Sequence, residues 1–93
     1  MDIGDGDYEA ILKEGIEIDF RSNGEWESVK SRNGVPASCV PIEISNYVKA
    51  NYPNRTIVKI SRKRSGNIEI ELGGIRDLEL LFDANGKFIR TDN

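Results

Sequence analysis

With no histidine in its 93 residues, this chain offers carboxylates and one thiol as its candidate groups for chemistry. Cys39 is the only cysteine, so an internal disulfide and a Cys–His nucleophile are both excluded. We expect Cys39 to be a buried structural thiol. Without imidazole there is no catalytic triad and no proton shuttle near neutral pH. We therefore assign no catalytic residue and expect that the chain is not an enzyme.

The sequence has 16 Asp and Glu residues, but their spacing suits the solvent face of a sheet better than a paired acid–base site. The carboxylates in question alternate with apolar residues: Glu17, Asp19, Glu69, Glu71 and Glu79. The opening Asp-Ile-Gly-Asp-Gly-Asp of residues 2–7 invites a calcium interpretation, but it does not follow the EF-hand spacing. We interpret residues 1–7 as a flexible acidic terminus. No metal ligand, cofactor-binding residue or cofactor is assigned.

Composition and charge exclude several classes of partner. The chain is 38% hydrophobic and 31% charged, which is typical of a globular domain, and its net charge of −3 gives no attraction to nucleic acid. The basic cluster is expected to be a solvated hairpin tip: Arg55, Lys59, Arg62, Lys63 and Arg64. No apolar run approaches the ~18 residues of a membrane span, so we expect no membrane insertion. No signal peptide is visible, and Gly73-Gly74 is expected to be a turn rather than a phosphate loop.

The chain contains a duplicated strand unit. Residues 8–26 resemble residues 68–88, with an offset of 60 for the first block and 62 for the rest. Both copies alternate apolar and polar residues, as half-buried antiparallel strands do, and such a repeat is one supersecondary unit used twice. The pattern predicts an α+β fold with an antiparallel sheet of about seven strands near residues 8–12, 16–21, 25–31, 56–63, 67–72, 77–83 and 87–91.

Asn-Gly turns set the register of both copies. A three-residue loop at 22–24, with Gly24 left-handed, pairs Phe20 with Trp26 and keeps the two faces of the hairpin consistent. The same loop at 84–86 pairs Phe82 with Phe88. The helix-facing side of the sheet should then contain these four aromatics together with Ile18, Ile70, Leu72, Leu80 and Val48.

Other pairs follow from the same rule. A loop at 64–66 is expected to set four pairs: Arg62 with Ile68, Ile60 with Ile70, Val58 with Leu72, and Lys59 with Glu71. The last is an opposite-charge contact across strands. In the first hairpin the register places Asp19 opposite Glu27, which is unfavourable.

One helix is predicted at residues 41–52, or from one turn earlier at Ser38. Its apolar and aromatic positions recur with a helical period: Ile44, Tyr47, Val48, Asn51 and Tyr52. Pro41 suits a first helical turn, and Pro53 ends the helix. Tyr47 and Tyr52 are expected to pack in or beside the core rather than to form a ligand platform.

Four segments in this order resemble the PepSY-like family, whose members are similar in fold to the β-lactamase inhibitor protein. They are Asn51-Tyr52-Pro53, Val58-Lys59-Ile60, Ile68-Glu69-Ile70-Glu71-Leu72 and Phe82-Asp83-Ala84-Asn85-Gly86-Lys87-Phe88. The resemblance covers about residues 8–90. It implies a single domain, 1–93, with a partial first unit at 8–31 that lacks a helix and a complete helix plus four-strand unit at 37–91.

The resemblance also bears on function. Related proteins are mostly bacterial, periplasmic or secreted, and without known catalysis. We therefore expect a non-catalytic, extracytoplasmic module that binds an unidentified protein, including as an inhibitor of an enzyme. One alternative is a structural domain that acts through homodimerisation. A single helix is too narrow for a sheet of this width, so Ile16, Ile18, Phe20 and Trp26 would be left partly open unless the sheet curls around the helix. The second alternative is small-ligand or cation sensing.

Overall fold

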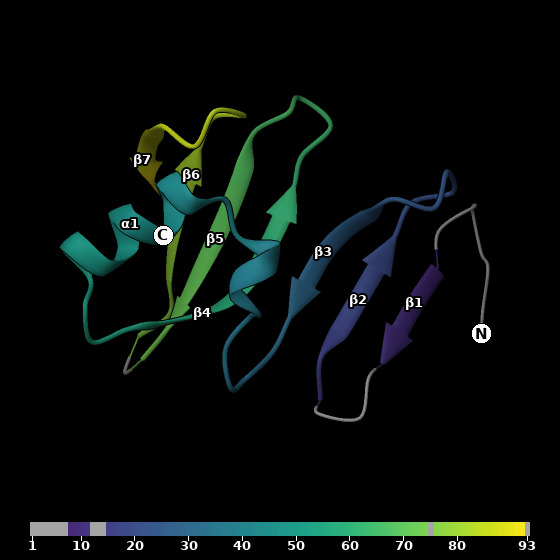
Figure 1. Cartoon of the computed structure of the whole chain (residues 1–93), viewed down its shortest axis with the longest axis horizontal. Helices are drawn as coiled ribbons and strands as arrows, with labels where there is room; N and C mark the ends of the chain where they lie inside the picture. The colour runs from purple at the N-terminus through teal and green to yellow at the C-terminus, as the bar shows by residue number, and fades with distance from the viewer. Residues whose placement is uncertain (1–7, 12–14, 75, 93) are drawn as a thin grey trace.

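The computed structural model describes residues 8–11, 15–74 and 76–92. In this part of the chain a seven-stranded antiparallel sheet carries its strands in sequence order, and one α-helix packs on one face (Figure 1). The expected α+β class, an antiparallel sheet with a single helix, is confirmed. The strands are β1 (Tyr8–Ile11), β2 (Glu17–Phe20), β3 (Trp26–Lys30), β4 (Thr56–Arg62), β5 (Ile68–Gly73), β6 (Leu78–Phe82) and β7 (Phe88–Thr91). The helix α1 is Ile42–Asn51, and a 3-10 turn, η1, precedes it at Ala37–Cys39.

The helix α1 lies where the sequence predicts it, one residue shorter at each end. Ile44 and Val48, one helical turn apart, are buried against the sheet. The Tyr52 N–H donates to the Val48 carbonyl at 2.7 Å and closes the last turn. The earlier start near Ser38 is instead the separate turn η1, because Pro41 has no N–H with which to continue a helix from the preceding turn.

The duplication is visible in the strand pairing. In the first copy, β1, β2 and β3 are neighbours, and Phe20 is opposite Trp26. In the second copy, β5, β6 and β7 repeat this order, and Phe82 is opposite Phe88. Both expected aromatic pairs are therefore confirmed.

Both repeated turns are three-residue loops that end in a left-handed glycine. The φ angle is 91° at Gly24 and 84° at Gly86, a region in which a side chain would be strained. In the first turn the Arg21 N–H donates to the Glu25 carbonyl at 2.7 Å, and the second turn repeats this bond at 2.8 Å. The loop length inferred from facial consistency is confirmed in both copies.

A β-bulge follows the first turn and corrects one expectation. Asp19 is opposite Ser28, not Glu27, so Glu27 is the extra residue of the bulge. The predicted repulsive pair is therefore wrong. The Ser28 hydroxyl donates to the Asp19 carboxylate at 2.9 Å, while Glu27 lies 3.8 Å from the Arg21 guanidinium. The bulge replaces a repulsion between like charges with a hydrogen bond.

A second bulge corrects the hairpin of β4 and β5. Its expected pairs hold as far as Lys59 opposite Glu71, but Leu72 is opposite Ile57 rather than Val58. Val58 is therefore the extra residue of a bulge on the side of β5. On its other side it continues the ladder with the chain that leaves β3, since Ser31 donates its N–H to the Val58 carbonyl at 2.9 Å.

The buried core lies between α1 and strands β3 to β6. It consists of Val29, Val40, Ile44, Val48, Ile60, Ile68, Ile70, Leu72, Leu80 and Phe82. Five of the residues expected on this side are therefore in the buried core: Val48, Ile70, Leu72, Leu80 and Phe82. Ile18, Trp26 and Phe88 are partly buried against it, and Phe20 is half-buried. The first copy thus contributes less to the core than the second.

Candidate functional site

The sheet face away from α1, here called the outer face, carries charges in a row that crosses the strands. The residues of this row stand directly opposite one another from β2 to β6: Glu17, Lys30, Lys59, Glu71 and Glu79. The two lysines lie over β3 and β4, and the two following glutamates lie over β5 and β6. The row therefore has a basic centre on β3 and β4, with Glu17 on one side and an acidic part on β5 and β6 on the other.

The lysines of this row are not neutralised by close ion pairs. Among the described residues the ion pairs within 4.0 Å are Lys63–Glu69 at 3.4 Å and Arg21–Glu27 at 3.8 Å. Lys59 stands opposite Glu71 as expected, but their charged groups do not approach within that distance. The charge of Lys59 therefore remains available to a ligand or partner.

The acidic part of the outer face contains a cluster of three carboxylates. One oxygen from each of Glu69, Glu79 and Asp92 lies within 4.8 Å of the others. Glu69 and Glu79 come from the neighbouring strands β5 and β6, and Asp92 directly follows β7. The Asp92 N–H donates to the Glu79 carbonyl at 2.7 Å and holds the end of the chain beside β6. Oxygen groups in this arrangement suit a hard divalent cation.

The surroundings of this cluster raise the pKa of the Glu79 carboxyl. Partial burial raises the pKa of its carboxyl above the ordinary value of 4.5, and the negative charges of Glu69, Glu71 and Asp92 raise it further. A hydrogen bond between the Glu79 and Glu69 side chains acts in the same direction. The site therefore favours either a proton or another positive charge at Glu79.

Sequence reasoning placed Glu69 and Glu79 on the solvent face but missed Asp92. A regular ladder after the turn at 84–86 would put Thr91 opposite Glu79. A bulge at Ile89 shifts β7 by one residue, so Thr91 is opposite Leu80 and Asp92 reaches Glu79. The repeated turn was the available signal, since a bulge occupies the equivalent place, Glu27, in the first copy.

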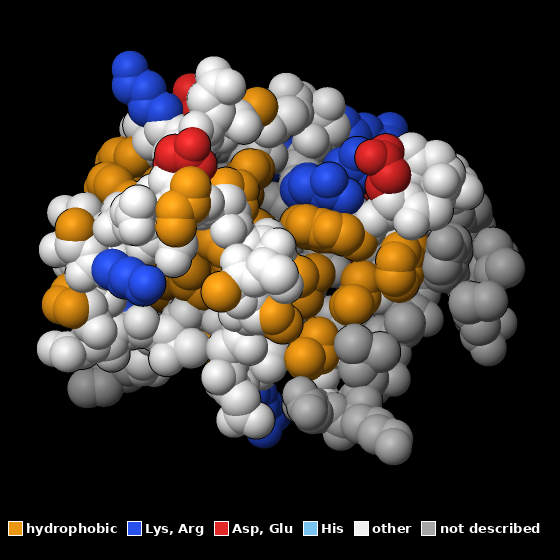
Figure 2. All heavy atoms as spheres, viewed as in Figure 1, with side chains coloured by type: hydrophobic (Ala, Val, Ile, Leu, Met, Phe, Trp, Pro, Cys, Tyr) orange, Lys and Arg blue, Asp and Glu red, His pale blue; other side chains and the backbone are white. Residues whose placement is uncertain are grey.

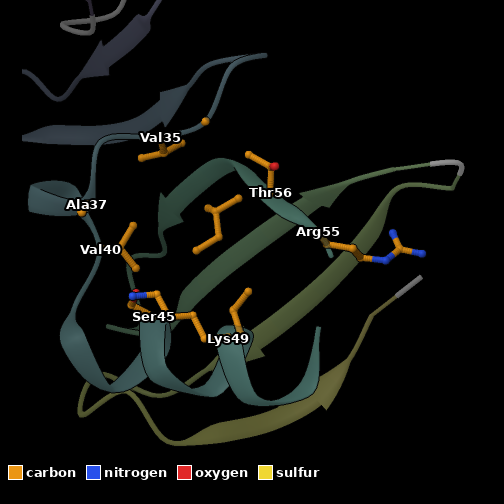
Figure 3. A pocket seen from close by; sticks show the side chains of 10 residues that line it. Val35, Ala37, Val40, Ser45, Lys49, Arg55 and Thr56 are labelled. Atoms are coloured by element: carbon orange, nitrogen blue, oxygen red, sulfur yellow. The ribbon is translucent and has the colours of Figure 1, made fainter. Parts of the chain in front are cut away.

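A second candidate site is a cavity of about 260 Å³ between α1, β4 and the chain that enters η1 (Figure 3). Its wall is largely apolar, and the Arg55 side chain extends away from it. Its volume is slightly below the ~300–1,000 Å³ of common small-molecule sites. The lining residues include no carboxylate, histidine or cysteine: Gly34, Val35, Ala37, Val40, Ser45, Val48, Lys49, Arg55, Thr56 and Ile57.

The other residues singled out in the sequence pack against the core or lie in turns. Cys39 is in η1 and is half-buried against the core, so it is less buried than expected, because the short turn lies at the edge of the helix layer. Tyr47 and Tyr52 pack against the core as expected. Gly74 follows β5 with a φ of 153°. The acidic stretch 2–7 lies outside the described residues.

The basic cluster is divided among different contacts. The Arg62 guanidinium lies 3.9 Å from the centre of the Trp26 ring and donates to the Trp26 carbonyl. Lys63 pairs with Glu69 on the outer face, and Arg55 donates to the Arg76 carbonyl. In the described part of the chain these side chains do not converge on one site.

Comparison with known proteins identifies the family. The family described as "Putative beta-lactamase-inhibitor-like, PepSY-like" matches residues 6–90, nearly the whole chain. The chain therefore belongs to the PepSY-like family, as its motifs indicated. No curated protein matches the chain. No helix in the described residues is long and apolar enough to cross a membrane.

Solved structures of similar proteins come from Bacteroides. A "putative periplasmic protein of unknown function" from Bacteroides vulgatus is 39% identical, with a TM-score of 0.82 over 94% of this chain and 68% of that one. A "putative calcium-regulated periplasmic protein" from Bacteroides thetaiotaomicron is 34% identical, with a TM-score of 0.82 over 94% and 67%. A second B. vulgatus protein, also described as periplasmic, is 32% identical with a TM-score of 0.78 over the same shares. The similar structures are thus periplasmic by description and carry no assigned catalysis.

Proposed function

We propose that this chain is a non-catalytic, periplasmic protein-binding module that engages its partner through the outer face of the sheet. The observation that carries the proposal is the order of charges across that face. Lys30 and Lys59 stand side by side on β3 and β4, between Glu17 of β2 on one side and the glutamates of β5 and β6 on the other. A surface with a basic centre and acidic flanks selects a partner with the complementary order of charges.

The lack of histidine and of converging catalytic groups in the described residues supports binding rather than turnover. The periplasmic descriptions of the similar structures support the location. The inhibitor-like description of the family supports an enzyme as one kind of partner. On this proposal, inhibition would follow when the outer face covers the entrance to a partner's active site.

A charge-reversal experiment tests this function. The chain, carrying a photocrosslinker at Ser61 on the outer face, is expected to capture a periplasmic protein, and Lys30→Glu with Lys59→Glu should abolish capture at physiological salt. Lys49→Glu, an equal change in an exposed position on α1, should leave capture intact. Equal capture by all three proteins, or none by the parent, would reject the outer face as the binding surface. Purified captured enzymes can then be assayed for inhibition.

A second candidate function is cation sensing at Glu69, Glu79 and Asp92. It is favoured by the 4.8 Å spacing of the three carboxylates and by the description of one similar structure as calcium-regulated. Bound calcium would relieve the mutual repulsion that raises the pKa of Glu79. Millimolar calcium should then raise the midpoint of thermal unfolding of the parent but not of Glu79→Gln. Glu25→Gln, away from the cluster, is the control, and an equal calcium response in all three would reject the site.

A further inference from the structure

The cavity of about 260 Å³ between α1, β4 and the chain that enters η1 reaches the edge of the core. Of its lining residues, Val40 and Val48 belong to the buried core, and Val35 and Ile57 pack against it. Figure 2 shows hydrophobic side chains at the surface of this region, between α1 and η1. A ligand with an apolar part would therefore gain by leaving water here.

The charged residues that line this cavity are all basic. Lys49 and Arg55 are among its lining residues, and no aspartate or glutamate is, although the whole chain has a net charge of −3. In the described part of the chain Lys49 forms no ion pair. The residues four positions before and after it are Ser45 and Pro53, so no carboxylate lies one helical turn away. The cavity therefore favours an anionic ligand.

The two basic side chains differ in where they place their charge. In Figure 3 the Arg55 side chain extends away from the cavity, and its guanidinium donates to the Arg76 carbonyl beside Gly74. The Lys49 side chain extends along α1 toward Ser45 in the same view. The charge at the cavity is therefore that of one ammonium, which matches the single charge of a carboxylate better than the double charge of a phosphate group.

Two hydroxyl groups line the same cavity, from Ser45 of α1 and Thr56 of β4. In the described residues neither forms a side-chain hydrogen bond, so both can donate to a ligand. Ser45 lies one helical turn before Lys49, on the same side of α1. Its hydroxyl and the Lys49 ammonium can therefore reach the same carboxylate.

We propose that this cavity binds a small monocarboxylate with an apolar body, of the kind that benzoate represents. The Lys49 ammonium holds the carboxylate, and the Ser45 hydroxyl donates a hydrogen bond to it. The apolar body lies against Val35, Val40 and Ile57. The volume, slightly below that of common small-molecule sites, limits this body to about the size of one ring. The cavity is on the helix side of the sheet, so this proposal stands apart from the outer face and its protein partner.

Titration of the isotope-labelled chain with sodium benzoate at constant ionic strength, followed by nuclear magnetic resonance, tests the site. The amide signals of Val35, Ser45, Lys49 and Ile57 should shift together and saturate, with a dissociation constant of about 1 mM for a ligand of this size. Benzyl alcohol has the ring without the charge, and acetate has the charge without the ring. Each should bind at least about tenfold more weakly than benzoate.

Two variants and one control locate the ligand. Lys49 is exposed, so Lys49→Gln should keep the fold, and it should weaken benzoate binding at least about tenfold, to the level of benzyl alcohol. Ser45→Leu, which fills the cavity from α1, should abolish the binding of both compounds, and its amide spectrum checks that it folds. Lys87→Gln removes an equal charge at an exposed position of the second turn and should leave binding unchanged.

Several outcomes would overturn the proposal. Benzoate shifts that do not saturate, or that appear at Lys30 and Lys59 of the outer face instead, would reject the cavity as the site. Undiminished binding to a folded Ser45→Leu variant would do the same. Equal affinities for benzoate and benzyl alcohol, or an unchanged benzoate affinity in Lys49→Gln, would reject a carboxylate as the recognised group.

Discussion

The two copies of the strand unit share their turns, their bulges and their aromatic pairs, but they differ in what lies on their helix-side face. In the second copy, the ring centres of Phe82 and Phe88 are 5.8 Å apart, and the Tyr47 ring of α1 packs against both. In the first copy, the Arg62 guanidinium lies over the Trp26 ring instead. The same local sequence pattern therefore gives the same strands and turns, while tertiary cover decides whether those strands form a core.

This difference separates two contributions to the fold. Alternation of apolar and polar residues and the Asn-Gly loops are local, and they specify hairpins in both copies. Burial of the apolar side is not local, since it requires a second layer. One helix supplies that layer for the second copy, so we expect stability to be concentrated there.

The largest expected effect comes from the matched phenylalanines of the two copies. Phe82→Ala should lower the free energy of unfolding by about 3–5 kcal/mol, because Phe82 is fully buried and its removal leaves a cavity under α1. Phe20→Ala, at the equivalent position, should cost only about 1–2 kcal/mol, because Phe20 is half-buried. Urea unfolding of both variants at low micromolar concentration measures the difference. Equal losses would show that the two copies are equally covered.

A smaller difference in the free energy of unfolding is expected between alanine variants of the two turn glycines, Gly24 and Gly86. Both are left-handed, so alanine should cost about 1–2 kcal/mol of backbone strain at either position. At Gly86 a new Cβ would also lie 2.8 Å from the Glu43 Cβ of α1. Gly86→Ala should therefore lose roughly a further 1–2 kcal/mol through overpacking. Thermal unfolding of Gly24→Ala and Gly86→Ala tests this, and a larger loss at Gly24 would contradict the placement of α1 over the second turn.

The smallest expected effect is a pH dependence of the free energy of unfolding, which comes from Glu79 in the second copy. Because the folded state raises the pKa of Glu79, it binds a proton there more tightly than the unfolded chain does. Protonation of Glu79 therefore stabilises the fold fully below about pH 4.5, and this contribution is lost as the pH rises through the folded pKa. Glu79→Gln should flatten the pH dependence above pH 4.5 and raise the unfolding midpoint at neutral pH. Glu17→Gln, at the other end of the charge row, is the control, and an unchanged pH profile in Glu79→Gln would contradict the assignment.

The fold could largely be predicted because its signals repeat. The three-residue loop of the first hairpin follows from the requirement that Phe20 and Trp26 share a face. The same requirement predicts, independently, that Phe82 pairs with Phe88 in the second hairpin. The strand alternation and the single helical period at residues 41–52 complete the α+β assignment. None of these features depends on contacts between distant parts of the chain.

The candidate site was harder to predict because it depends on bulges. A one-residue shift at Ile89 brings Asp92 to Glu79, and the equivalent shift at Glu27 gives Asp19 a hydroxyl partner. Alternation gives the face of a residue but not the place where a strand gains an extra one. Residue types alone therefore placed Glu69 and Glu79 on a solvent face without indicating that a third carboxylate joins them.

Native-state hydrogen exchange tests the central claim, that the helix covers the second copy of the strand unit better than the first. Amides of β2 should exchange at least about tenfold faster than those of β5 and β6, a gap of about 1.4 kcal/mol in opening free energy. Equal protection of β2 and of β5 and β6 would contradict the account.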